Sequence, residues 1–114
     1  MEIAQLETGG VKVIAPVGRV DSSTARDVET ALMPMFEDGV PIVFDFADLT
    51  YISSAGLRVL LMAAKRSKAS GVPIALAGMS PSVNEVFQIS GFAKLFAIHD
   101  DRAAAVNALA VAGA

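Results

Sequence analysis

The chain has 114 residues, a length that fits one domain, so we expect residues 1–114 to form a single domain. It contains no cysteine, which excludes disulfides, cysteine nucleophiles and thiolate metal sites. Its net charge is −3, whereas proteins that bind nucleic acid normally carry an excess of basic residues, so we expect no nucleic-acid partner.

Neither end of the chain reads as a membrane or export segment. Residues 103–114 are uncharged, but a membrane-spanning helix needs about 20 apolar residues. The N-terminus carries acid rather than base and has no apolar core, unlike a signal peptide. We therefore expect a cytoplasmic protein with no membrane partner.

The first third of the chain predicts a hairpin followed by a helix. Residues 3–6 and 11–17 are apolar runs joined by a Gly-Gly turn, which favours two antiparallel strands. Polar residues that suit a helix cap come next, and apolar residues then recur every three or four positions over 24–36, which predicts an amphipathic helix. Pro34 is expected to weaken its last turn.

The middle of the chain predicts a buried strand, a loop and a second helix. Residues 41–46 are almost continuously apolar, as in a central strand covered on both faces. We expect a loop from there to Ser53 and a helix that starts near Ser54 and ends before Gly71. The expected buried stripe of this helix consists of Leu57, Leu60, Leu61 and Ala64.

The last third repeats the alternation. Residues 73–77 form an apolar strand, and Pro81 suits the first position of the helix that follows. Residues 96–98 predict a short final strand, and Asp100 and Asp101 can cap a last, alanine-rich helix. The fold class is therefore α/β, with a mixed sheet of four or five strands, an N-terminal hairpin and about four packed helices.

Two serines at the start of the second helix are the most informative polar residues. A hydroxyl at such a position ordinarily caps the helix by accepting a bond from a free first-turn amide. The same amides and the positive end of the helix dipole also favour an anion, so a phosphate on Ser54 would be tolerated. Gly56 would keep the turn slim enough for another protein to approach. The residues alone leave both roles of the hydroxyl open.

Other kinds of site have weaker support. A serine nucleophile elbow requires glycine two residues before the serine, where this chain has Ile52, and His99 is the sole histidine. One histidine argues against zinc, and the glycines match no P-loop or dinucleotide fingerprint. We expect no catalytic residue, metal or cofactor, hence not an enzyme. Three acids could cluster at one end of the sheet: Asp21, Asp45 and Asp48. The simpler interpretation of each is an acid that caps a helix or stabilises a turn.

The sequence has one cluster of basic residues, formed by Lys65, Arg66 and Lys68. Its simplest interpretation is the solvated face of the second helix. The alternative is a docking surface for an acidic partner.

The segment DLTYISSAGLRVLL, residues 48–61, resembles the signature of STAS domains in the anti-sigma-factor antagonist family. Two further segments resemble that family, GRVDSSTARDVE at 18–29 and GVPIALAGMSPSVNEVFQISGFAKLF at 71–96. The likeness covers essentially the whole chain in a consistent order. It implies a single STAS-like domain.

The resemblance also implies a function. An unphosphorylated antagonist of this family binds an anti-sigma factor, itself a GHKL-type serine kinase, and so releases the sigma factor. The kinase then phosphorylates one serine of the antagonist, and the phosphorylated antagonist dissociates from the kinase. A PP2C-type phosphatase reverses the phosphorylation. Alignment on Gly56 implies Ser54 as the phosphoacceptor, with Ser53, which stands where many members have Asp, as the second choice. The partner-binding residues implied are Asp21, Ser22, Ser23, Thr24, Ser53, Ala55, Gly56 and Arg58.

Two other functions remain as alternatives. The chain could be a STAS scaffold subunit of a larger signalling or lipid-transport assembly, without phospho-switching. It could also be a small-ligand sensor or hydrolase that uses Ser54, although it has no recognisable pocket motif.

Overall fold

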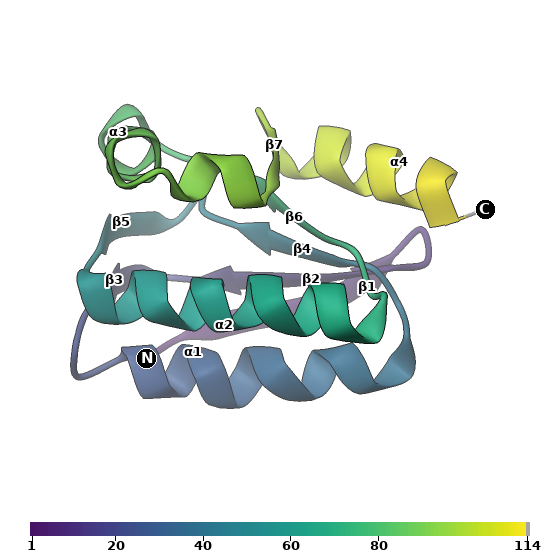
Figure 1. Cartoon of the computed structure of the whole chain (residues 1–114), viewed down its shortest axis with the longest axis horizontal. Helices are drawn as coiled ribbons and strands as arrows, with labels where there is room; N and C mark the ends of the chain where they lie inside the picture. Colours follow the sequence, from purple (N-terminus) through teal and green to yellow (C-terminus); the bar gives the residue numbers. More distant parts are fainter. Residues whose placement is uncertain (114) are drawn as a thin grey trace.

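The strands at the centre of the protein form a mixed sheet of five in the order β1-β2-β4-β6-β7 (Figure 1). The computed structural model describes residues 1–113, and burial is described for side chains of residues 1–110. β1 and β2 are an antiparallel hairpin, and the other pairs in this sheet are parallel. A separate parallel pair joins β3 to β5. The strands are β1 (Ile3–Thr8), β2 (Val11–Pro16), β3 (Gly18–Val20), β4 (Ile42–Asp45), β5 (Leu49–Ile52), β6 (Ile74–Ala77) and β7 (Ala97–His99).

Helices cover both faces of the five-stranded sheet. One core cluster packs α1, α2 and α3 with one face of the sheet, and a smaller cluster packs α4 on the opposite face. Figure 1 shows α1 and α2 on one side of the sheet and α4 on the other. The α/β class, the N-terminal hairpin and the four packed α-helices are thus confirmed. The helices are α1 (Ala25–Leu32), α2 (Ser54–Ser70), α3 (Pro81–Ser90) and α4 (Arg102–Gly113), with 3₁₀ turns η1 (Met33–Asp38) and η2 (Phe92–Leu95). No α-helix in the described part of the chain is both long and apolar enough to cross a bilayer.

The expected helix over 24–36 is divided in two. α1 ends at Leu32, and the chain continues as the 3₁₀ turn η1, in which Pro34 is the second residue. Proline has no amide to donate and its ring crowds the preceding turn, so the α-helical ladder stops at this point. The predicted weakening is therefore confirmed, and it begins earlier than expected.

The expected loop before Ser53 contains a strand that the sequence did not reveal. Leu49–Ile52 forms β5, which pairs with β3, itself missed between the hairpin and the first helix. Each strand has only three or four residues, and the residues of β5 are in turn buried, exposed, exposed and buried. Neither therefore shows the period of two by which strands are recognised.

The buried face of α2 is shifted by about one residue from the predicted stripe. Leu60 is buried as expected, but Val59 and Ala63 fill the core while Leu61 and Ala64 are only half-buried. Seven consecutive residues from 57 to 63 include six apolar ones, so periodicity alone does not fix which side faces inward. Gly71 ends this helix with φ of 75°, a left-handed conformation that glycine adopts without strain.

Candidate functional site

The short β3–β5 pair brings two distant loops to the same end of the protein. The strands run parallel with Val20 opposite Ile52, and the amide of Ser53 continues the ladder by donating to the carbonyl of Val20 at 2.8 Å. Asp21 follows Val20 directly. The pairing therefore places Asp21 beside the start of α2.

The two serines at this helix start have different surroundings. The hydroxyl of Ser53, the N-cap residue, accepts a hydrogen bond from the amide of Gly56 at 3.4 Å. Ser53 is half-buried, whereas Ser54 is exposed at the first position of α2. No hydrogen bond of the Ser54 hydroxyl occurs within the described residues. The cap predicted for this pair thus belongs to Ser53, and the neighbouring hydroxyl is accessible.

Gly56 is buried beneath this surface rather than exposed on it. A Cβ at this position would lie 2.7 Å from Cγ1 of Ile52 and 2.8 Å from Cγ1 of Val20. Both distances are shorter than real Cβ contacts, so only glycine lets α2 pack this closely on β3 and β5. The absence of a side chain at Gly56 therefore makes room for the buried side chains of Val20 and Ile52. Our expectation that Gly56 keeps an outer turn slim for an approaching protein was wrong.

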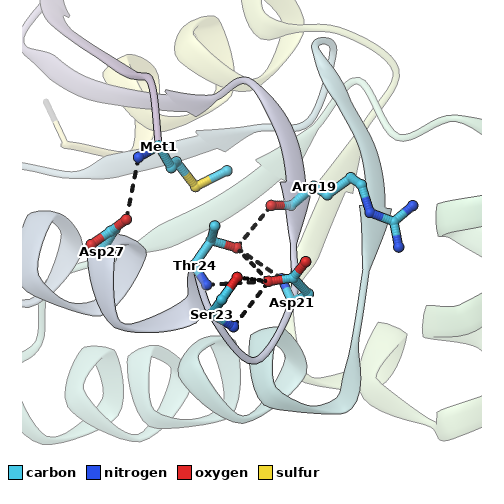
Figure 2. A network of polar contacts seen from close by, with 6 residues as sticks. All are labelled: Met1, Arg19, Asp21, Ser23, Thr24 and Asp27. Atoms are coloured by element: carbon cyan, nitrogen blue, oxygen red, sulfur yellow. Dashed lines mark hydrogen bonds and ion pairs between the residues drawn. The ribbon is translucent and has the colours of Figure 1, made fainter.

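Asp21 organises the loop between β3 and α1, as Figure 2 shows. Its Oδ1 accepts bonds from the amide and the hydroxyl of Ser23 at 2.9 and 2.7 Å. The amide of Thr24 also donates to this oxygen, at 3.2 Å. The Thr24 hydroxyl accepts from the Asp21 amide at 2.9 Å and donates to the carbonyl of Arg19 at 2.8 Å. This loop is consequently held in one shape before any partner arrives.

These contacts keep Asp21 ionised. The Ser23 hydroxyl and amide are the main causes that lower the pKa of the Asp21 carboxyl below its ordinary value. Desolvation opposes them in part, and the Thr24 hydroxyl and amide lower the pKa by smaller amounts. All the bonds that the Asp21 carboxylate accepts reach Oδ1, and within the described residues no donor bonds Oδ2. The loop thus presents a fixed negative charge with one free oxygen.

The remaining residues implied by the resemblance surround this centre. Ser22 is exposed on the Asp21 loop, and Ala55 is half-buried beside Ser54. Arg58 is exposed and follows Ser54 by four positions, a spacing that puts both on one face of α2. The structure therefore gathers these residues, from two segments separated in sequence, at one end of the molecule.

An aromatic contact next to this centre was not predicted from the sequence. The guanidinium of Arg19 on β3 lies 4.2 Å from the ring centre of Tyr51 on β5, a cation–π distance. Tyr51 is 40% exposed, so this pair forms part of the surface. The contact depends on the unforeseen β3–β5 pairing, and no local motif would have revealed it.

The three acids for which the sequence left a cluster at one end of the sheet open have separate surroundings. Asp45 is buried and accepts a bond from Nε of Arg102 at 2.8 Å, whereas Asp21 bonds its own loop. Asp48 is exposed, and its carbonyl accepts from Gly18 at 2.9 Å. Among the described residues, no three acidic or histidine side chains are grouped as metal ligands would be.

Comparison with known proteins identifies the family. Residues 2–105 match the STAS domain. The chain is 35% identical over 113 residues to BtrV of Bordetella bronchiseptica, a protein assigned to the anti-sigma factor antagonists, with 98% of this chain and 97% of BtrV covered. The chain therefore belongs to the STAS-domain family of anti-sigma-factor antagonists.

Solved structures share the fold. A Thermotoga maritima protein assigned to the same class superposes with a TM-score of 0.86 at 18% identity, covering 94% of this chain and 93% of that one. The Bacillus cell fate determinant SpoIIAA, solved in its phosphorylated form, gives 0.66 at 21% identity, covering 85% and 90%. At these identities the likeness supports the fold alone.

Proposed function

We propose that this antagonist is a switch whose state is set by phosphorylation of Ser54. Unphosphorylated, it binds an anti-sigma factor that is also a GHKL-type serine kinase, and the sigma factor is released. Phosphorylated on Ser54, it leaves that partner, and a PP2C-type phosphatase restores the binding form. We place this cycle in the cytoplasm, and the chain itself acts as a substrate and binding partner rather than as an enzyme.

The division of roles between the two serines carries the proposal. A kinase needs a hydroxyl that reaches solvent, and Ser54 is exposed at the first position of α2. Ser53 is half-buried and its oxygen is engaged by the Gly56 amide. Phosphorylation of Ser53 would break the cap, whereas phosphorylation of Ser54 leaves it in place.

Electrostatics explains how the phosphate would act on binding without unfolding the domain. A phosphoserine adds roughly −1.5 to −2 charge units, which the free amides and dipole of a helix N-terminus stabilise. Asp21 is held ionised on the adjacent loop, so the second charge would make this surface strongly negative. A partner surface suited to the neutral hydroxyl would then be repelled. A 100-fold loss of affinity requires only about 2.7 kcal/mol.

The relatives are consistent with such a switch. SpoIIAA has been solved both unphosphorylated and phosphorylated, and its fold is shared by this chain. The remaining partner-binding surface that we propose consists of Asp21, Ser22, Ser23, Thr24, Ser53, Ala55 and Arg58, with Gly56 shaping it from beneath.

A phosphorylation assay with matched serine variants tests this proposal. The protein, Ser54→Ala and Ser53→Ala are each incubated with ATP and the GHKL-type kinase encoded nearest to this chain's gene. Intact mass and peptide mapping then locate the phosphate. We expect one phosphate on Ser54 in the unaltered protein and in Ser53→Ala, and none in Ser54→Ala. A phosphate on another residue, or none in any protein, would contradict the site assignment.

A binding measurement tests the switch itself. We expect Ser54→Ala to bind the kinase as tightly as the unaltered protein and to stay bound after ATP is added. Ser54→Asp should bind about 100-fold more weakly. Equal affinity of the phosphorylated and unphosphorylated proteins would favour the scaffold alternative.

A further inference from the structure

An open groove lies along the C-terminal half of α2, away from the loop that carries Asp21. It has a volume of about 350 Å³ and is lined by α2 residues together with Leu95 of η2. Its lining is mainly apolar, and we call Leu61, Ala64 and Leu95 its floor and the exposed Lys65 and Lys68 its rim. The lining residues are Leu61, Ala64, Lys65, Ser67, Lys68 and Leu95.

The three apolar side chains of the floor are only partly buried by the rest of the protein. Leu95 is 50% exposed, and Leu61 and Ala64 are half-buried although the sequence predicted them to face the core. Leaving such surface in water forgoes roughly 25 cal/mol per Å² of stabilisation. A partner that covered these side chains would recover that contribution.

The rim of the groove carries two positive charges that are not paired with carboxylates among the described residues. Lys65 and Lys68 are exposed, and neither forms an ion pair with a carboxylate of the described residues. Residues 49–99 hold five of the nine basic residues of the chain but only one of its twelve acidic residues. Lys65 and Lys68 therefore give the groove a local positive charge on a protein of net charge −3.

We propose that this groove binds an acidic amphipathic helix of a partner protein. Apolar side chains of that helix, at i and i+3 or i+4, would cover Leu61, Ala64 and Leu95, while its flanking carboxylates pair with Lys65 and Lys68. The apolar floor contributes affinity, and the two lysines exclude basic or uncharged helices. This binding stands independently of phosphorylation at Ser54, which α2 places about 10 Å or more along its axis from Leu61.

A second copy of this chain suits the groove less well. None of its acidic residues lines the groove, so a copy that docked on the lysines through its acids would use a different surface from the groove itself. Such a contact is heterologous, and unless its rotation closes a ring it extends into open filaments.

The test uses a fluorescein-labelled peptide of about 18 residues, long enough to form a helix. One face of the peptide carries leucines, and glutamates flank them. A second peptide replaces every glutamate with lysine. Binding to the full chain is followed by fluorescence anisotropy, and the contact is mapped by amide chemical shifts. We expect the acidic peptide to bind, to shift the signals of residues 61–68 and 95, and to outcompete the basic peptide.

Matched variants distinguish binding in the groove from non-specific electrostatic attraction between the acidic peptide and the protein. Lys65→Glu with Lys68→Glu should weaken binding about tenfold, because each reversal replaces an attraction with a repulsion. Arg66→Glu with Arg26→Glu makes the same change of charge on exposed residues outside the groove and should have far less effect. Leu95→Ala should also weaken binding, whereas Ile89→Ala, at a side chain 79% exposed and outside the groove, should not.

Three results would overturn the proposal. They are the absence of binding, equal losses in the two charge-reversed doubles, and shifts confined to residues outside the groove. Sedimentation of the chain alone supplies a further check, since self-association abolished by Lys65→Glu with Lys68→Glu would assign the groove to a second copy. Ser54→Ala should bind the peptide normally, so failure here is distinguishable from failure of the phosphorylation switch.

Discussion

The hydroxyl oxygen of Ser53 accepts a hydrogen bond from the amide of Gly56 and so closes the first turn of α2. This contact leaves the next hydroxyl, that of Ser54, exposed at the helix start. A structural role and a proposed regulatory role are thus assigned to adjacent serines, and substitution should separate them.

Ser53→Ala should lower stability without preventing phosphorylation. Loss of an N-cap costs about 1 kcal/mol, and the 3.4 Å donor–acceptor distance places this cap at the weaker end. Ser54→Ala removes an exposed hydroxyl and should change stability by less than about 0.5 kcal/mol. Urea unfolding of the two variants beside the unaltered protein measures both effects. Equal destabilisation by the two substitutions would contradict the assignment of the cap.

Gly56→Ala should destabilise the protein although alanine is the better helix former. Helix propensity alone would add about 1 kcal/mol of stability. The new Cβ, however, would lie 2.7 Å from Ile52 and 2.8 Å from Val20, both buried β-branched side chains with little freedom to move. Overpacking of this kind costs about 1 to 3 kcal/mol, so the net effect is a loss. Thermal unfolding measures it, and an increase in midpoint would show that the strands can yield.

Much of the fold could be predicted because its signals are local. The Gly-Gly turn predicted the hairpin, the apolar run 41–46 predicted the central strand, and Pro81 predicted the start of α3. Each of these signals comes from the backbone chemistry of glycine or proline, or from a run of apolar residues buried on both faces. Such signals can be recognised within one segment of the sequence.

The features that were missed depend on contacts between distant segments. The β3–β5 pairing involves strands too short to show a period, and it is this pairing that positions Asp21 beside the helix start. Which serine caps α2, and which side of α2 faces the core, likewise depend on how the helix packs on Val20 and Ile52. The resemblance supplied the list of site residues, but only the packing shows why Gly56 must be glycine.

Arg102→Leu should destabilise the protein by leaving a buried carboxylate unpaired. Nε of Arg102 donates to Asp45, whose side chain is only 4% exposed, while that of Arg102 is 39% exposed. Removing one member of a buried pair costs about 3 to 5 kcal/mol, and the partial exposure of Arg102 should reduce this to about 2 kcal/mol. The double variant Asp45→Asn with Arg102→Leu should be more stable than Arg102→Leu alone. Urea unfolding of the four proteins completes the cycle, and strict additivity would contradict the coupling.

Asp21→Asn should alter the response of stability to acid. Because hydrogen bonds from Ser23 and Thr24 lower the pKa of Asp21 in the folded protein below its ordinary value of 3.8, ionisation of this group favours the folded state. That contribution is fully present above the unfolded pKa and is lost as pH falls through the lower folded value. The stability difference between the unaltered protein and Asp21→Asn should hence stay constant above about pH 5 and shrink below about pH 4. Denaturant midpoints across this range provide the measurement, and a constant difference down to the lowest pH would contradict the assignment.

Ser54→Asp should separate the effect of negative charge on folding from its effect on binding. A carboxylate at the first position of α2 interacts favourably with the helix dipole, by about 0.3 to 1 kcal/mol. It also precedes Arg58 by four residues, the favourable order for an acidic and a basic side chain, which adds about 0.2 to 0.5 kcal/mol. Ser54→Asp should therefore unfold at a higher urea concentration than Ser54→Ala. Arg58→Ala introduced into both variants should reduce this difference, and high salt should reduce it further because both contributions are screened.

The same substitution should weaken binding to the anti-sigma partner, since a charge that the helix tolerates still faces the opposing surface beside ionised Asp21. Higher stability together with lower affinity is the combination expected of a switch that acts through its surface. If Ser54→Asp instead lost stability along with affinity, the negative charge would be acting by disordering the start of α2. Hydrogen exchange of the amides from Ser54 to Arg58 distinguishes the two, because a surface switch leaves their protection unchanged or increased.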